Sequence, residues 1–252
     1  PQRRCRRVAA ATWKIQVAPD SSSAPSRAVE APAGADAFSL LSKQLVELAR
    51  SVASNGWGVM DSFVRGTEAD VLHLALRRWW AEAEGERPPE RGPEPRTGAV
   101  SAYGSLPEMR TVEARVGLLV AELVNNVPEL AGFAQCEPPM RAAMHATAHP
   151  PHFDYLPEHE FELRRVCTLI LYLNPFWCEE HGGELRLYPE SVADGRAEAA
   201  VGGPWDTRGE ASVRVEPLHG RLVAFLCEGR NAHEVLPVWQ PRFAITWWLR
   251  CK

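Results

Sequence analysis

Two histidines and an aspartate form the most distinctive chemical pattern in the chain. His152 and Asp154 are separated by a single residue, and His233 lies far downstream, after a predicted strand and turn. In an extended strand, residues i and i+2 project to the same side, so His152 and Asp154 can bind one ion. Two histidines and one carboxylate are the facial ligand set of non-haem Fe(II) oxygenases, which leaves coordination positions open. Because a His-x-Asp motif alone arises easily by chance, the prediction of an iron site depends on all three residues.

An arginine inside the last apolar segment is the second unusual feature. Every second residue of a strand shares a face, and one face of this predicted strand carries Arg242, Ala244, Thr246 and Trp248. A guanidinium in such a strand is costly unless it meets an anion, and its planar fork suits a carboxylate. A dicarboxylic keto acid that chelates iron at one end would need such a partner at its other end. The pattern therefore predicts a two-oxygen chelating cosubstrate, with dioxygen at the remaining iron position.

The elements that must position these residues change character at Pro138. Before it, apolar periodicity predicts helices between about 36 and 83, interrupted by a strand-like run at 56–60, and another helix over 112–124. After it, β-forming runs predict several short strands, at 166–173, 184–188, 221–226 and 243–249. Pro189 is expected to end the second of these strands. Short strands separated by turns indicate an antiparallel sandwich or barrel.

Composition divides the chain into a leader and one domain. Residues 1–35 hold six basic and two acidic residues and are rich in Ala, Ser and Pro. This composition is typical of an organelle transit peptide, with a disordered leader as the alternative. Residues 36–252 are expected to form a single domain, with helical support in 36–137 and the strand-rich core in 138–252. The Pro- and Gly-rich stretch 84–99 is predicted to be a mobile loop.

Overall charge and cysteine usage exclude several classes of function. The 252 residues include 28 basic and 32 acidic residues, a net charge of −4, which disfavours a nucleic-acid partner. There is no apolar run of about eighteen residues, so no transmembrane segment is predicted. The six cysteines are scattered without a Cys-x-x-Cys pair, which indicates a reducing, intracellular compartment. This is the cytoplasm or nucleus, or a plastid or mitochondrion if the leader is a transit peptide. We expect a monomer.

The segments that carry these residues resemble the 2-oxoglutarate- and iron-dependent prolyl hydroxylases, most of all the hypoxia-inducible-factor type. The resemblance rests on HFD at 152–154, RRVCTLILYLNPFW at 164–177, GGELRLYPE at 182–190 and the stretch 215–250, which ends PRFAITWWLR. It implies a mainly β fold with N-terminal helices, in which helices support a double-stranded β-helix (jelly-roll) core. It also implies Fe(II) as cofactor, 2-oxoglutarate as cosubstrate and O2 as co-reactant, with ascorbate as a candidate reductant.

The resemblance also assigns roles to individual residues. It implies that His152, Asp154 and His233 bind the metal and that Arg242 completes the catalytic set. Arg242 and Tyr172 would bind the far carboxylate of 2-oxoglutarate. The remaining cosubstrate-binding positions that it implies are Thr246, Trp248, Ile170 and Leu185.

The function implied by the resemblance is hydroxylation of a prolyl residue in a protein or peptide, with release of succinate and CO2. Collagen-type relatives use lysine for the distant carboxylate, and AlkB-type demethylases have an arginine where this chain has Trp248. His145 in place of an aromatic hydroxyl, and a long insertion at 191–212, depart from the family pattern and bear on the substrate. The alternatives are a dioxygenase of the same fold with a non-prolyl substrate, and a non-catalytic jelly-roll binding module.

Overall fold

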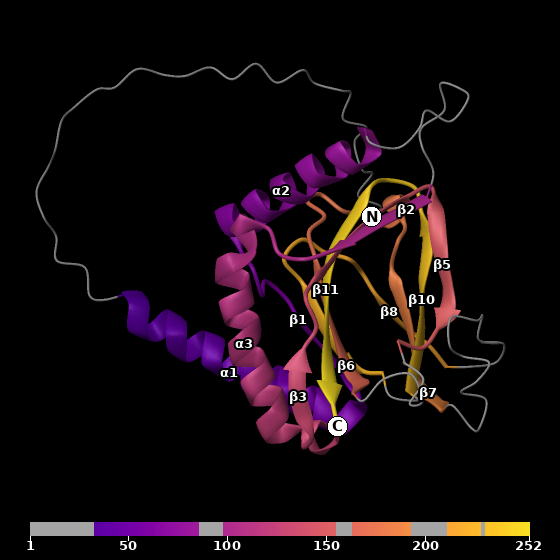
Figure 1. Ribbon diagram of the computed structural model, residues 1–252. Helices are drawn as coiled ribbons and strands as arrows, with labels where there is room; N and C mark the ends of the chain where they lie inside the picture. The colour runs from indigo at the N-terminus through magenta and orange to yellow at the C-terminus, as the bar shows by residue number, and fades with distance from the viewer. Residues whose placement is uncertain (1–32, 86–97, 155–162, 193–210, 228–229) are drawn as a thin grey trace, which may run out of the picture.

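The protein consists of two antiparallel sheets with helices against one of them (Figure 1). The computed structural model describes residues 33–85, 98–154, 163–192, 211–227 and 230–252. The larger sheet has the strand order β1-β9-β6-β11-β4-β2, with β3 also paired to β11, and the smaller sheet has the order β5-β10-β7-β8. Figure 1 shows the helices on one side of the larger sheet and the smaller sheet on the other. The predicted mainly β jelly-roll fold with N-terminal helices is confirmed.

The helices and strands lie close to the predicted segments where the sequence pattern was long. The helices are α1 (Ala33–Asn55), α2 (Gly66–Gly85) and α3 (Arg110–Asn126), with short 3-10 helices η1 (Pro107–Met109), η2 (Pro128–Leu130) and η3 (Glu179–His181). The strands are β1 (Trp57–Met60), β2 (Gly98–Tyr103), β3 (Phe133–Cys136), β4 (Met140–His145), β5 (Thr147–His152), β6 (Arg164–Tyr172), β7 (Leu185–Val192), β8 (Val213–Val215), β9 (Leu222–Leu226), β10 (Arg230–Val238) and β11 (Arg242–Cys251). Within the described ranges, no helix is both long and apolar enough to cross a bilayer.

Three strands from residues 36–137 join the larger sheet. β1 pairs with β9, β2 with β4, and β3 with β11. Residues 36–137 therefore contribute strands as well as helices. Most of the leader 1–35, of the loop predicted at 84–99 and of the insertion at 191–212 lies outside the described residues.

Alternation along the central strands assigns one face to the core and the other to the site. Phe243, Ile245 and Trp247 of β11 are buried in the cluster formed with the helices. Arg242 and Thr246, on the opposite face of the strand, line a cavity between the sheets. Because successive side chains in a strand point to opposite faces, β11 supplies both layers at once.

One strand runs further than predicted. β7 continues through Pro189 to Val192, although the proline was expected to end it. The pairing of β7 with β10 shifts register between Arg230 and Ala232, in the stretch opposite Tyr188 to Val192. The proline, which has no N–H to donate, therefore lies where the hydrogen-bond ladder is already interrupted.

The core packing predicts a large effect for a single leucine. Leu171 of β6 is fully buried between the sheet and the helices. We expect Leu171→Ala to lower the free energy of unfolding by about 2–5 kcal/mol, because the cavity it leaves cannot fully collapse. Leu118 on α3 is 47% exposed, and Leu118→Ala should change that free energy by about 0.5 kcal/mol or less. Urea denaturation measures both, and equal effects would contradict the packing described here.

Candidate active site

The three predicted metal ligands lie together between the sheets. β5 and β10 are paired so that His152 and His233 are directly opposite each other, and Asp154 follows just after the end of β5. Nε2 of His152 is 3.7 Å from Oδ1 of Asp154, and Nε2 of His233 is 3.6 Å from its Oδ2. One ligand atom from each residue lies within 4.8 Å of the other two. Strand register thus brings together residues that are distant in the sequence.

The second nitrogen of each histidine is held by the backbone. Nδ1 of His152 lies 2.9 Å from the carbonyl oxygen of Pro150, and Nδ1 of His233 lies 3.2 Å from that of Asn231. If Nδ1 carries the proton, it donates to the carbonyl and leaves the Nε2 lone pair for a metal. This is the tautomer that a ligating histidine requires.

The ionisation of the site suits a divalent cation. Burial acts to raise the pKa of Asp154, but the adjacent His233 and His152 and the N–H of Trp248 hold this pKa well below its usual range. Burial lowers the pKa of His233 to about 4, which leaves its imidazole neutral at pH 7. Burial acts to lower the pKa of His152 as well, but Asp154 and the carbonyl of Pro150 raise it overall. An ionised carboxylate and a neutral imidazole are the forms that bind metals, so a metal would displace any proton on Nε2 of His152.

A single cavity of about 460 Å³ holds the triad and Arg242. Arg242 is only 6% exposed. The predicted cosubstrate-binding residues other than Tyr172 also line this cavity, namely Ile170, Leu185, Thr246 and Trp248. The space between the triad and the guanidinium is therefore bounded mainly by apolar walls, as a chelating cosubstrate requires.

Arg242 and Tyr172 form a buried pair. Nε of Arg242 donates to the carbonyl of Gly183 at 2.8 Å, and its guanidinium carbon lies 4.9 Å from the centroid of the Tyr172 ring. The fully buried Tyr172 hydroxyl has no hydrogen-bond partner among the described residues. Burial lowers the pKa of Arg242, since the cation has lost its water. A cation and an unpaired hydroxyl in this position fit an incoming carboxylate, which would stabilise both. Tyr172 packs against Arg242 and is not part of the cavity lining, so its role stays a prediction.

A glycine keeps room for the arginine. Gly183 has φ +78°, and a Cβ built there would lie 2.8 Å from Cδ of Arg242. We expect Gly183→Ala to displace Arg242, weaken its bond to the Gly183 carbonyl and raise KM for 2-oxoglutarate roughly tenfold. Gly117 in α3 is the matched control, because nothing lies within 4 Å of a Cβ added there. Steady-state kinetics of both variants test this, and an unchanged KM for Gly183→Ala would refute it.

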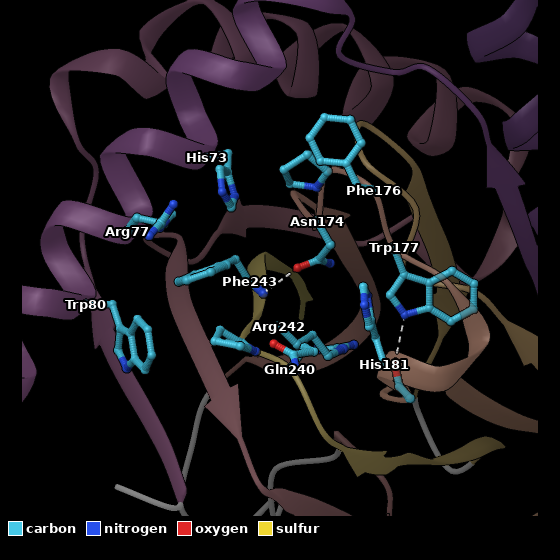
Figure 2. A pocket seen from close by; sticks show the side chains of 13 residues that line it. His73, Arg77, Trp80, Asn174, Phe176, Trp177, His181, Gln240, Arg242 and Phe243 are labelled. Carbon is cyan, nitrogen blue, oxygen red and sulfur yellow. Dashed lines mark hydrogen bonds between the residues drawn. The ribbon is translucent and has the colours of Figure 1, made fainter. Parts of the chain in front are cut away.

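A second cavity of about 420 Å³ also has Arg242 in its lining (Figure 2). Two hydrogen bonds fix the chain around it. Oδ1 of Asn174 accepts from the backbone N–H of Phe243 at 2.7 Å, and the indole of Trp177 donates to the carbonyl of Gly182 at 2.8 Å. Both bonds immobilise chain segments next to Arg242 or Gly183. They therefore support the orientation of the guanidinium from behind.

The sequence interpretation missed several residues around the metal centre. His149 is exposed and is not one of the three grouped ligands, but it lines the first cavity, and its ring centroid is 4.2 Å from that of His152. Thr168 and Arg165, neither of which was singled out, contact Asp154 and Trp248 respectively. For Thr168 the available signal was a polar residue in the middle of an otherwise apolar strand. His181 lines the second cavity and lies away from the triad.

The comparisons with known proteins agree with this geometry. Residues 140–250 match the family described as the 2OG-Fe(II) oxygenase superfamily, and this segment contains the whole triad and Arg242. Residues 140–250 form a 2OG-Fe(II) oxygenase domain. The family match and the triad imply Fe(II) and 2-oxoglutarate, as predicted, with His152, Asp154 and His233 as the facial triad.

Individual relatives of the oxygenase are prolyl hydroxylases. It is 40% identical over 85 residues to a hypoxia-inducible factor prolyl hydroxylase of Caenorhabditis elegans. The aligned segment covers 33% of this chain and 9% of that protein. It is 38% identical over 88 residues to a prolyl hydroxylase of Mus musculus, covering 33% of this chain and 28% of that protein. The matched segment is thus a small part of both curated relatives.

Solved structures extend the likeness over most of the oxygenase. A prolyl-4-hydroxylase of Pseudomonas putida superposes with a TM-score of 0.62 and 25% identity, over 82% of this chain and 99% of that one. A prolyl hydroxylase of Trichoplax adhaerens, solved with a hypoxia-inducible factor peptide, gives a TM-score of 0.66 at 18% identity, over 86% and 94% of the two chains. The second of these likenesses shows the fold alone.

Proposed function

We propose that the protein hydroxylates a prolyl residue in a protein or peptide, coupled to conversion of 2-oxoglutarate into succinate and CO2. The observation that carries this proposal is that the triad and the buried Arg242 line one cavity. The relatives in sequence and structure that are prolyl hydroxylases support the choice of substrate class.

In this proposal the chain holds its reactants by two sets of contacts. Nε2 of His152, Nε2 of His233 and a carboxylate oxygen of Asp154 hold Fe(II). Bound there, Fe(II) supplies the chemistry that lets O2 oxidise 2-oxoglutarate and insert an oxygen atom into a C–H bond of the substrate. Arg242 pairs with the far carboxylate of 2-oxoglutarate, and the Tyr172 hydroxyl donates to the same carboxylate.

The walls of the cavity orient the cosubstrate and exclude water. Ile170 and Leu185 offer only apolar surface, so a keto acid between them is confined to the line from the triad to Arg242. The exposed side of the cavity is bordered by His149 and by Ser101 of β2. We assign this side to the substrate. Positioning of this kind is the part of such a reaction that the protein itself supplies.

Mass spectrometry of candidate peptides tests the proposal. Proline-containing peptides would be incubated with the protein, Fe(II), 2-oxoglutarate and ascorbate, and succinate would be measured in parallel. The expected result is a gain of one oxygen atom, roughly 16 Da, on proline, with one succinate formed per hydroxylation. Replacement of that proline by alanine in the peptide should abolish the mass gain.

The two alternative functions give different results in the same experiment. A dioxygenase with a non-prolyl substrate would form succinate from 2-oxoglutarate without oxidising any proline. A non-catalytic jelly-roll module would form no succinate above the level of a His233→Ala control. Either result would refute prolyl hydroxylation, and only the second would also refute oxygenase activity.

A further inference from the structure

One oxygen of the Asp154 carboxylate is tied to the protein by two donors. Oγ1 of Thr168 donates to Oδ2 at 2.8 Å, and Nε1 of Trp248 donates to the same atom at 2.9 Å. The other carboxylate oxygen, Oδ1, lies 3.7 Å from Nε2 of His152. The two bonds to Oδ2 thus hold the carboxylate in one orientation, with Oδ1 on the side of the ligand nitrogen of His152.

The indole of Trp248, which makes one of these bonds, is held in place by an ion pair between Arg165 and Glu137. The guanidinium carbon of Arg165 lies 4.0 Å from the ring centroid of Trp248. Nε and Nη2 of Arg165 each donate to Glu137 at 2.7 Å, one to each carboxylate oxygen. The backbone N–H of Glu137 donates to the carbonyl of Trp248 at 2.8 Å. Glu137 therefore contacts both the backbone of Trp248 and the cation that covers its ring.

The Arg165–Glu137 ion pair is sheltered from solvent. The side chains of Arg165 and Glu137 are 15% and 11% exposed. Burial acts to lower the pKa of Arg165, but the bonds and charge of Glu137 more than reverse this, so its pKa is raised. A bidentate pair with both oxygens engaged has a fixed geometry, unlike an exposed ion pair between flexible side chains.

We propose that Trp248 is a positioning residue for the metal, which fixes the Asp154 carboxylate through its N–H and is held in place by the Arg165–Glu137 ion pair. The resemblance assigns Trp248 to the cosubstrate pocket, and Trp248 does line that cavity; its indole N–H in addition donates to Asp154. Glu137 lies outside the segment 140–250 that matches the family. The inference rests on the proposed iron site and is independent of the prolyl substrate.

Metal affinity measured without turnover tests this inference. Co(II) would be titrated into metal-free protein and followed by its visible absorption. Trp248→Phe keeps an aromatic ring beneath Arg165 but removes the N–H donor, and we expect it to weaken Co(II) binding by about 10–100-fold. Trp247→Phe is the matched control, because Trp247 is the neighbour of Trp248 in the sequence but its ring is buried in the core cluster with the helices. This variant should bind Co(II) like the wild type. Thermal unfolding of each variant verifies that it is folded.

A double-mutant cycle tests whether Glu137 affects metal binding through Trp248 or only through the general stability of the fold. Glu137→Gln alone should weaken Co(II) binding roughly 3–10-fold, because the ring is less firmly held. In the Trp248→Phe background the same change should have almost no further effect, since Glu137 acts through the indole. Additive effects, or wild-type affinity in folded Trp248→Phe, would overturn the inference. A wild-type protein that binds no Co(II) would instead refute the iron site itself, and the inference with it.

Discussion

The His233→Ala variant is expected to lose turnover of 2-oxoglutarate by more than about 100-fold. Removing a residue that only hydrogen-bonds a metal ligand already costs up to about 100-fold, and the loss of a ligand should cost more. His233 is 4% exposed and supplies one of only three ligand atoms, so neither water nor a neighbouring side chain replaces it well. Alanine in its place leaves Asp154 and one histidine, which is a weak site for Fe(II). Succinate formation and the iron content of purified protein measure the effect.

His181→Ala is the appropriate control for this variant. His181 lines the second cavity, whose lining includes Arg242 but none of the three ligands (Figure 2). We expect it to keep its iron and most of its activity. If the two variants lost iron to the same extent, the assignment of His233 as a ligand would be wrong.

Replacing Arg242 by glutamine should raise KM for 2-oxoglutarate by about 30-fold or more, because truncating one partner of a buried charge pair costs at least about 2 kcal/mol. Glutamine keeps the aliphatic stem and a polar amide, but it is shorter and lacks the cation that would face the far carboxylate. Arg242→Lys keeps the charge but loses the planar guanidinium, which can bind a carboxylate through two hydrogen bonds. Its KM should therefore lie between those of the wild type and Arg242→Gln. Steady-state kinetics with 2-oxoglutarate as the varied reactant measure this.

Arg77→Ala separates a specific role of Arg242 from a general effect of positive charge. Arg77 lines the second cavity and is exposed on α2. Its removal should leave KM for 2-oxoglutarate unchanged. Similar KM values for Arg242→Gln and the wild type would show that the far carboxylate binds elsewhere. Binding of Co(II) to Arg242→Gln should equal that of the wild type, since Arg242 is not a ligand.

The sequence predicted the site better than the surrounding sheets. His152, Asp154 and Arg242 could be found because rare residue types stood at strand-compatible spacings, and each type has a restricted chemistry. The long apolar run of β6 was recognisable as a strand for a similar reason, since a strand buried on both faces reads as continuous hydrophobic sequence.

The features that sequence reasoning missed depend on pairing between distant segments. β2 (Gly98–Tyr103) is short, rich in small residues and half-exposed, and it becomes a strand through pairing with β4. Pro189 was expected to end β7, and only the register shift in β10 explains why the strand continues. The link from Glu137 through Arg165 to Trp248 likewise joins three separate strands or connections, so no local pattern in the sequence reveals it.

A crystal grown without oxygen in the presence of Fe(II) and 2-oxoglutarate tests the central claim most directly. Anomalous scattering should show a single iron peak bounded by Nε2 of His152, Nε2 of His233 and a carboxylate oxygen of Asp154. The far carboxylate of 2-oxoglutarate should then lie within hydrogen-bond distance of the Arg242 guanidinium. An iron peak away from these three atoms, or a 2-oxoglutarate molecule that does not reach Arg242, would contradict the account.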